Sequence, residues 1–393
     1  MTALERRAVG SLALLYSFRM LGLFMVLPLL ALYAADMPGA TPAMIGLALG
    51  VYGLTQALLQ IPFGWLSDHV GRKPVIIGGL GLFVLGSVVA AYAESVAGVI
   101  FGRSLQGAGA IAGTVMALVA DVTREEQRTK AMAMVGMSIG LSFALALVIG
   151  PVVAAAGGLS AVFWFTAALA LVGIAIVVLL VPTPAATGLQ HADVGTRVGL
   201  LGRSFRDPAL QRLNFGVFSL HFILMACFLL VPTFLEGVAG IDRGRHWLVY
   251  LPALGLSIAG MVPMMILAER GGRPHPVFLA GISLLLVSVA ILGFSVSPIA
   301  YFLGLWVFFV GFNYLEATLP SLVSKAVFAG GKGTALGIYS TCQFLGAFAG
   351  GALGGWLLQE GGVGALIAAC LVLATLWLIL VLPARAMPLP ARQ

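Results

Sequence analysis

The segment GWLSDHVGRKP, residues 64–74, places an aspartate, a histidine, an arginine and a lysine in a chain that is 61% hydrophobic and 9% charged. Its central part, LSDHVGR, returns in weakened form 201 residues later as LAERGGR, residues 267–273. A shift of 204 residues likewise places Arg128 on Lys332. The same charged loop at the same point of two stretches predicts that the chain consists of two related halves.

Long apolar runs follow one another on both sides of these segments, and the mean hydropathy is +1.08. A helix needs about 20 mostly apolar residues to cross a hydrocarbon core of about 30 Å. Backbone groups in lipid must be hydrogen-bonded within their own segment, so we expect these runs to be helices. The candidate spans are residues 9–33, 43–63, 75–93, 97–120, 131–156, 160–181, 210–235, 247–268, 276–296, 298–322, 334–358 and 363–382.

The predicted fold is therefore an all-α integral membrane protein, with twelve transmembrane helices in two pseudo-symmetric six-helix bundles. A polar stretch interrupts the apolar pattern after the sixth span and is interpreted as a cytoplasmic linker. The predicted divisions are a first bundle over residues 1–182, the linker over 183–207, a second bundle over 208–383 and a short cytoplasmic tail over 384–393.

The basic residues follow the topology expected of a membrane protein. All but four of the 21 lysines and arginines lie at the termini or in even-numbered loops; the exceptions are Arg19, Arg103, Arg243 and Arg245. This asymmetry predicts cytoplasmic termini in an inner or plasma membrane, and it accounts for the net charge of +7 without nucleic acid. The three cysteines lie in spans without a Cys-x-x-Cys pair, so no disulfide, metal or cofactor is expected.

The charged loop after the second span is a candidate gate. Asp68 lies at the C-terminal end of a helix, where the dipole disfavours an anion, and it therefore needs a partner. Asp121 is expected to pair with Arg72 and form a cytoplasmic latch, made when that side is closed. The alternative is a solvated loop whose ion pairs contribute little. The candidate gate residues are Gly64, Asp68, Gly71, Arg72, Lys73, Asp121, Glu125 and Arg128.

Four ionisable residues lie inside spans, where they are costly and indicate function. They are Glu316, Arg103, Arg19 and His221, the candidates for proton coupling. Glu316 is the preferred proton carrier, with Asn313 one turn away; the alternative is a carboxylate permanently paired with an arginine. Arg103 could instead bind span-one carbonyls. Arg19 is expected either to meet a substrate anion or to hold Glu316 across the halves.

Polar residues elsewhere in the spans are candidates for a substrate cavity between the halves. They are Tyr52, Gln56, Gln60, Gln106, Asn313 and Gln343. A mostly apolar cavity with few polar groups favours amphipathic substrates, although each residue alone is also compatible with plain packing. Asp36 and Glu236 are interpreted as ordinary residues at the level of the lipid headgroups.

Glycines spaced by four residues predict close helix contacts. The clearest case is the stripe of Gly346, Gly350 and Gly354 in span eleven. For the remaining pairs, close packing and chance spacing both stay open; these pairs are Gly46 with Gly50, Gly109 with Gly113, and Gly136 with Gly140.

Several of these segments resemble a known family. Residues 64–73 resemble the cytoplasmic signature motif of the major facilitator superfamily, and RSLQGAG, residues 103–109, resembles a motif of its proton-driven members. LGLFMVLP, residues 21–28, resembles a motif of its drug:proton antiporters. FRMLGLFMVLP, YGLTQALLQIPFGWLSD and NYLEATLPSLVSK are similar to YajR-type transporters, without the cytosolic domain that those proteins carry after the last span.

The resemblance implies alternating access, a role of Arg103 in proton coupling, and an Asp68 cluster that contacts span eleven and stabilises the outward-open state. The expected function is proton-coupled export of small amphipathic compounds by a monomer whose partners are substrate, protons and the lipid bilayer. The alternatives are a proton symporter that imports a nutrient and a non-transporting membrane sensor. The sequence contains no Ser-His-Asp set, HExxH motif or phosphate loop, so no enzyme activity is expected.

Overall fold

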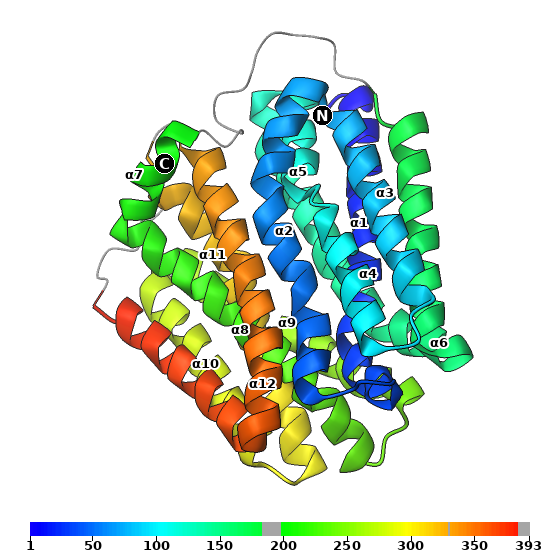
Figure 1. Ribbon diagram of the computed structural model, residues 1–393. Helices are drawn as coiled ribbons and strands as arrows, with labels where there is room; N and C mark the ends of the chain where they lie inside the picture. Colours follow the sequence, from blue (N-terminus) through cyan, green and yellow to red (C-terminus); the bar gives the residue numbers. More distant parts are fainter. Residues whose placement is uncertain (183–197, 329–330, 384–393) are drawn as a thin grey trace.

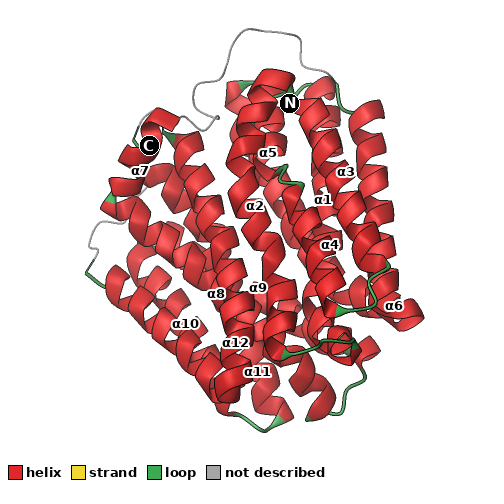
Figure 2. Cartoon of the chain, in the orientation of Figure 1, coloured by secondary structure: helices red, strands yellow, loops and turns green. Residues whose placement is uncertain are grey.

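The computed structural model describes residues 1–182, 198–328 and 331–383, and within them the secondary structure is helical (Figures 1 and 2). Two short 3-10 turns, η1 and η2, accompany the α-helices. The elements are α1 Ala3–Tyr33, η1 Ala34–Asp36, α2 Pro42–Val70, α3 Arg72–Ala91, α4 Val96–Ala108, α5 Ala112–Asp121, α6 Glu125–Leu179, α7 Val198–Arg206, α8 Pro208–Gly237, η2 Arg243–Arg245, α9 Trp247–Glu269, α10 Pro274–Phe294, α11 Pro298–Ala326 and α12 Lys332–Val381.

Ten segments of the described chain are long and apolar enough to cross a membrane, and two of them contain two predicted spans each. The segments α6 and α12 have 55 and 50 residues, about twice the length of one crossing. The chain turns inside α6 at Gly157 and Gly158, and inside α12 at Gly362. The predicted twelve spans are thus accounted for, and α1–α6 and α8–α12 are called the first and second halves below.

The backbone conformation of the glycines reflects the internal repeat. Six glycines of the described residues have a positive φ, a conformation that residues with a Cβ rarely adopt. They form three pairs at separations of 201, 201 and 204 residues: Gly39 with Gly240, Gly71 with Gly272, and Gly158 with Gly362. The two halves therefore make their tightest turns at equivalent positions, at the same shifts that relate the charged loops.

Span four has the predicted extent, but its helix is interrupted. The helix α4 ends at Ala108 and α5 begins at Ala112. A Cβ atom at Gly109 would collide with the carbonyl oxygen of Gly79 in α3, so the two backbones touch at the break. The Gly109 carbonyl accepts a hydrogen bond from Arg19 Nη2 at 3.2 Å, which satisfies an oxygen that the helix leaves free. The expectation of one continuous helix over 97–120 is wrong for this reason.

The two halves touch most closely where α2 begins. A Cβ atom at Gly46 would lie 2.7 Å from the Cα atom of Gly355 in α12, and one at Gly50 would lie 3.1 Å from the Cα atom of Phe348. Only glycine permits such an approach of two helix backbones. We call this end of the molecule, with Gly46 and Gly355 at its centre, the closed end.

At the opposite end the halves separate. Gln60 makes a hydrogen bond across the halves, from its Nε2 to Thr341 Oγ1 at 2.8 Å. One turn further, a Cβ atom at Gly64 would meet no heavy atom within 4 Å, and Trp65 is 60% exposed. In Figure 1 the ribbons of α2 and α12 diverge toward this end, which also carries the N-terminus. We call it the open end.

The glycine stripe of span eleven packs as predicted. A Cβ atom at Gly346 or Gly350 would collide with the backbone of Phe218 or Phe222, so this face of α12 lies directly on α8. The sequence did not single out the opposite face of α12, where Gly351 and Gly355 contact α2. Of the open cases, Gly46 and Gly50 pack closely, whereas a Cβ atom would meet nothing within 4 Å at the positions Gly113, Gly136 and Gly140.

The predicted linker is partly helical. The helix α7 covers Val198–Arg206, and Asp207 begins α8 by accepting hydrogen bonds from the amides of Ala209 and Leu210 at 2.8 and 3.2 Å. The guanidinium of Arg203 lies 4.0 Å from the ring centroid of Phe328. The end of the linker therefore contacts the second half, while residues 183–197 and the tail 384–393 lie outside the described residues.

Candidate functional site

The predicted gate forms a compact ionic cluster at the open end. Arg72, the first residue of α3, pairs with Asp68 at the end of α2 and with Asp121 at the end of α5, where Nε and Oδ2 are 3.1 Å apart. Its Nη1 also donates to Ser67 Oγ at 2.6 Å. Gly71, with φ of 103°, makes the sharp turn that brings the two helix ends together.

This cluster lies within the first half. The ion-pair partner of Asp68 among the described residues is Arg72, and the expected contact of Asp68 with span eleven is not made in this structure. The ribbons of α2 and α12 diverge toward this end (Figure 1), and a Cβ atom at Gly64 would meet no heavy atom within 4 Å. Lys73 lies beside the cluster in the first turn of α3.

Glu125 and Arg128 do not join the cluster. Both belong to the first turns of α6, where Glu125 is exposed and Arg128 Nε has no hydrogen-bond partner within the described ranges. The neighbouring Arg124 instead pairs with Glu5 of α1, with Nε and Oε1 2.9 Å apart. The sequence analysis missed this contact, although Thr2 and Glu5 carry the spacing of a capping box that the structure contains.

Two predicted proton-coupling residues meet in the second half. Gln343 of α12 donates from Nε2 to Glu316 Oε1 of α11 at 3.2 Å, and the same Nε2 lies 2.8 Å from His221 Nε2 of α8. His221 Nε2 is 3.8 Å from Glu316 Oε2. Glu316 Oε2 has no hydrogen-bond partner among the residues that the structure describes, and the Glu316 side chain is 36% exposed. Asn313 points elsewhere and donates to Ser257 Oγ at 2.9 Å.

Both ring nitrogens of His221 lie within hydrogen-bond distance of a polar atom. Its Nδ1 lies 3.1 Å from the Val217 carbonyl oxygen, an acceptor, so Nδ1 carries the proton. Nε2 then has a lone pair and accepts from Gln343. The Gln343 amide thus donates both protons, one to the histidine and one to the carboxylate.

Arg19 lies in the first half, and its side chain is 1% exposed. Its Nη2 donates to Tyr52 Oη at 2.7 Å and to Gln56 Oε1 at 2.9 Å, in addition to the Gly109 carbonyl. Of the two alternatives expected for Arg19, the pairing with Glu316 is not made in this conformation of the described residues, because the guanidinium is enclosed by residues of its own half.

Arg103 is also fully buried. Its Nη1 donates to Gln106 Oε1 at 3.0 Å, and its other two nitrogens donate to the carbonyls of Ala48 and Leu49 at 3.3 and 3.4 Å. These carbonyls belong to span two, which corrects the expectation of span one. The guanidinium lies 5.1 Å from the ring centroid of Tyr52, within reach of a cation–π interaction.

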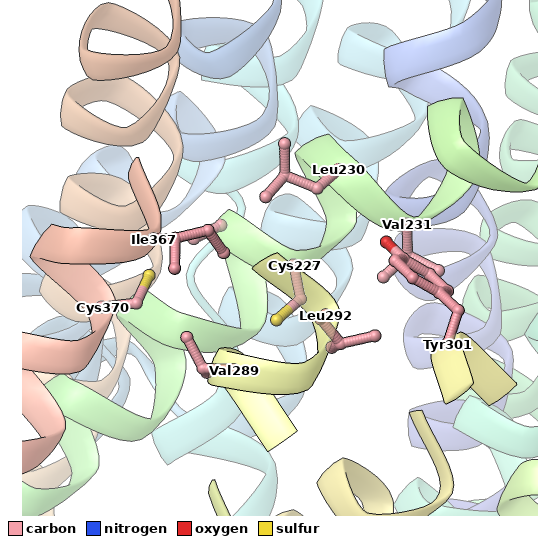
Figure 3. A pocket seen from close by; sticks show the side chains of 9 residues that line it. Cys227, Leu230, Val231, Val289, Leu292, Tyr301, Ile367 and Cys370 are labelled. Carbon is pink, nitrogen blue, oxygen red and sulfur yellow. The ribbon is translucent and has the colours of Figure 1, made fainter. Parts of the chain in front are cut away.

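The predicted cavity residues of span two are not open to solvent in this conformation. Tyr52 and Gln56 are 3% and 0% exposed, and so is Gln106 of span four at 1%; each accepts a hydrogen bond from Arg19 or Arg103. Gln60 bridges the halves, as described above. A pocket that Figure 3 shows lies elsewhere, among apolar residues of the second half that include Cys227 and Cys370, and its volume of about 10 Å³ suits no more than one water.

An ionic bridge crosses between the halves at the closed end. Arg243 of η2 pairs with Glu236 of α8, with Nε and Oε1 2.8 Å apart, and with Asp36 of η1, with Nη1 and Oδ2 3.2 Å apart. It also lies 5.0 Å from the ring centroid of Tyr33. Asp36 and Glu236 are thus more than ordinary headgroup-level residues. The sequence feature that could have predicted this bridge is Arg243, which is an exception to the pattern of the basic residues.

Two helical halves that meet face to face in a membrane, with charged residues buried between apolar spans, define a polytopic transport protein. Residues 12–327 match the family model of the Major Facilitator Superfamily. The chain belongs to this superfamily.

Comparison with known proteins supports the same assignment. The chain is 46% identical to the inner membrane transport protein YajR of Escherichia coli K12, over 96% of this chain and 83% of that protein. It is 28% identical to the multidrug resistance protein MdtH of Aeromonas hydrophila, over 86% of this chain and 84% of that protein. The fold is similar to that of a bacterial homolog of the human lysosomal transporter Spinster in an inward-facing and occupied conformation, with a TM-score of 0.78, 14% identity and 97% of both chains covered.

Proposed function

We propose that this inner-membrane transporter is a monomer that couples proton entry to the export of small amphipathic compounds by alternating access. The observation that carries the proposal is the network of Glu316, Gln343 and His221, which lies within apolar spans and leaves one carboxylate oxygen without a hydrogen-bond partner in the described part of the chain. A carboxylate at that depth is costly, and reversible protonation removes the cost. The similarity to multidrug resistance proteins supports export.

The proposed proton step needs only this network. A proton that enters binds Glu316 Oε2, the free acceptor, and neutralises the carboxyl group. The hydrogen bond from Gln343 to Oε1 then weakens, because a neutral acceptor binds an amide proton less strongly than a carboxylate does. Since Glu316 and Gln343 lie on α11 and α12, protonation alters the contact between two helices of the second half, and a bundle that rocks can respond to this change.

We further propose that the open end faces the cytoplasm, since the basic residues concentrate in its loops. The conformation is then inward-open, with the closed end sealed by the glycine contacts and the Arg243 bridge. The ion pairs of Asp68, Arg72 and Asp121 are formed although this side is open. They therefore hold the loop between α2 and α3 in its conformation before the loop docks on span eleven. Its docking on span eleven would belong to the outward-open state.

The test is proton flux in vesicles that contain the purified protein, across a panel of cationic, neutral and anionic amphipathic compounds. Inverted vesicles distinguish the two directions, because substrate addition releases protons for an antiporter and consumes them for a symporter. Glu316→Gln should abolish proton flux that depends on substrate while exchange of substrate without a proton gradient persists. Glu94→Gln, a change at an exposed glutamate, is the matched control and should retain coupling.

Undiminished proton coupling in Glu316→Gln would refute the assignment of the proton site. Failure of the native protein to move any compound of the panel would favour a non-transporting role instead.

A further inference from the structure

The first half contains two buried arginines, whereas Glu5, the acid that is buried among its described residues, pairs with Arg124. Arg19 and Arg103 are 1% and 0% exposed, and their guanidinium carbons lie 6.0 and 5.1 Å from the centroid of the same Tyr52 ring. None of the ion pairs found among the described residues includes either arginine. Removing one charge from water without a counter-charge costs several kcal/mol, and two adjacent cations add their repulsion.

The two arginines differ in how well they are satisfied. All three nitrogens of Arg103 donate hydrogen bonds. Arg19, by contrast, donates from Nη2, while its Nε and Nη1 have no hydrogen-bond partner among the described residues. Gln56 is 0% exposed and accepts from Arg19 through Oε1, and within the same part of the chain its amide nitrogen has no partner either. These three buried atoms are all donors, so whatever satisfies them is an acceptor.

The break in span four adds to the positive electrostatic potential around Arg19. Arg19 contacts the Gly109 carbonyl, and α5 starts three residues later without a side chain that caps its N-terminus. The free amides of a helix N-terminus favour a negative charge.

We propose that a small monovalent anion of about the size of chloride binds beside Arg19, between α1, α2 and the start of α5. The positive charge of the two arginines and the three donor atoms select a negatively charged acceptor. The small size follows from burial, because Arg19 and Gln56 are closed to solvent and a substrate carboxylate has no access to them in this conformation. The anion would compensate the buried charge and tie three helices of the first half together, independently of proton coupling at Glu316.

The test compares chloride with gluconate at equal ionic strength, using the purified full chain in nanodiscs. Raising chloride from 1 to 100 mM should raise the unfolding temperature by about 3 °C, as expected for a ligand that binds only the folded state with a Kd near 1 mM. Arg19→Gln should lose this shift. Arg245→Gln, a change at an exposed arginine outside the cluster, should keep it.

Gln56→Leu keeps Arg19 but removes one unpartnered donor, so it should reduce the chloride shift even if Arg19→Gln fails to fold. Crystals grown in bromide should show anomalous scattering beside Arg19. Equal unfolding temperatures in chloride and gluconate, a shift that survives both substitutions, or bromide bound elsewhere would overturn the proposal and leave water as the occupant.

Discussion

Gly46→Ala is the sharpest test of how the halves close. The added Cβ atom would lie 2.7 Å from Gly355 Cα and 3.0 Å from Gly355 N, and it would collide with the carbonyl oxygen of Gly351. Carbon atoms that are not bonded prefer a separation of about 3.5–4.0 Å, so α2 and α12 must move apart by roughly 1 Å. The neighbours are backbone atoms, and no change of rotamer relieves the contact.

The magnitude follows from the cost of overpacking. Such insertions cost about 1–3 kcal/mol, and here the cost falls on the conformation in which the closed end is closed. The equilibrium should therefore shift about 5- to 150-fold toward opening of that end. The transport cycle requires both states, so a shift of this size should also slow transport.

The assay is double electron–electron resonance on the protein without its three native cysteines. Spin labels at the exposed positions Pro38 and Glu360 report on the closed end, and labels at Val70 and Lys332 report on the open end. Gly46→Ala should lengthen the first distance and shorten the second. Gly136→Ala, where the new Cβ atom meets nothing within 4 Å, should change neither. Identical distance distributions in Gly46→Ala and the parent would refute the argument.

Two further changes test the charged clusters. Asp68→Asn removes the pair with Arg72, so transport should fall while the unfolding temperature stays close to that of the parent; full transport activity would reduce this cluster to surface ion pairs. Arg243→Gln breaks the pair with Asp36, which crosses the halves and contributes about 0.2–1 kcal/mol, so it should favour opening of the closed end by about 1.4- to 5-fold in the same spin-label assay. Because salt screens exposed charges, this effect should shrink at 1 M salt, and a salt-independent shift would contradict the bridge.

The sequence was informative where one residue type or one periodicity determines the structure. Apolar length predicts a span whatever its neighbours are, so the spans and the duplicated architecture could be predicted. The ionic contact of the charged loop could also be predicted, because Asp68 and Arg72 are four residues apart with a glycine between them. The pair of Arg72 with Asp121 required only that two loops lie on the same side of the membrane.

Contacts between distant helices were the part that could not be predicted. The partners of Arg19 come from span two and the break in span four, and no spacing in the sequence indicates which helices surround span one. The same holds for Arg103, which donates to backbone carbonyls of span two. Every residue has a carbonyl, so the sequence does not indicate which ones accept. Glu316 and His221 were each singled out, but the amide of Gln343 that joins them becomes visible only when three helices are in place.

The glycine turns at Gly158 and Gly362 have a consequence for biogenesis. Spans five and six are joined without an intervening loop, and so are spans eleven and twelve. The second span of each pair therefore leaves the ribosome directly after the first. We expect each pair to enter the bilayer as a preformed hairpin. Epitope tags or fusion partners inserted at these two glycines should therefore abolish assembly of the protein in cells.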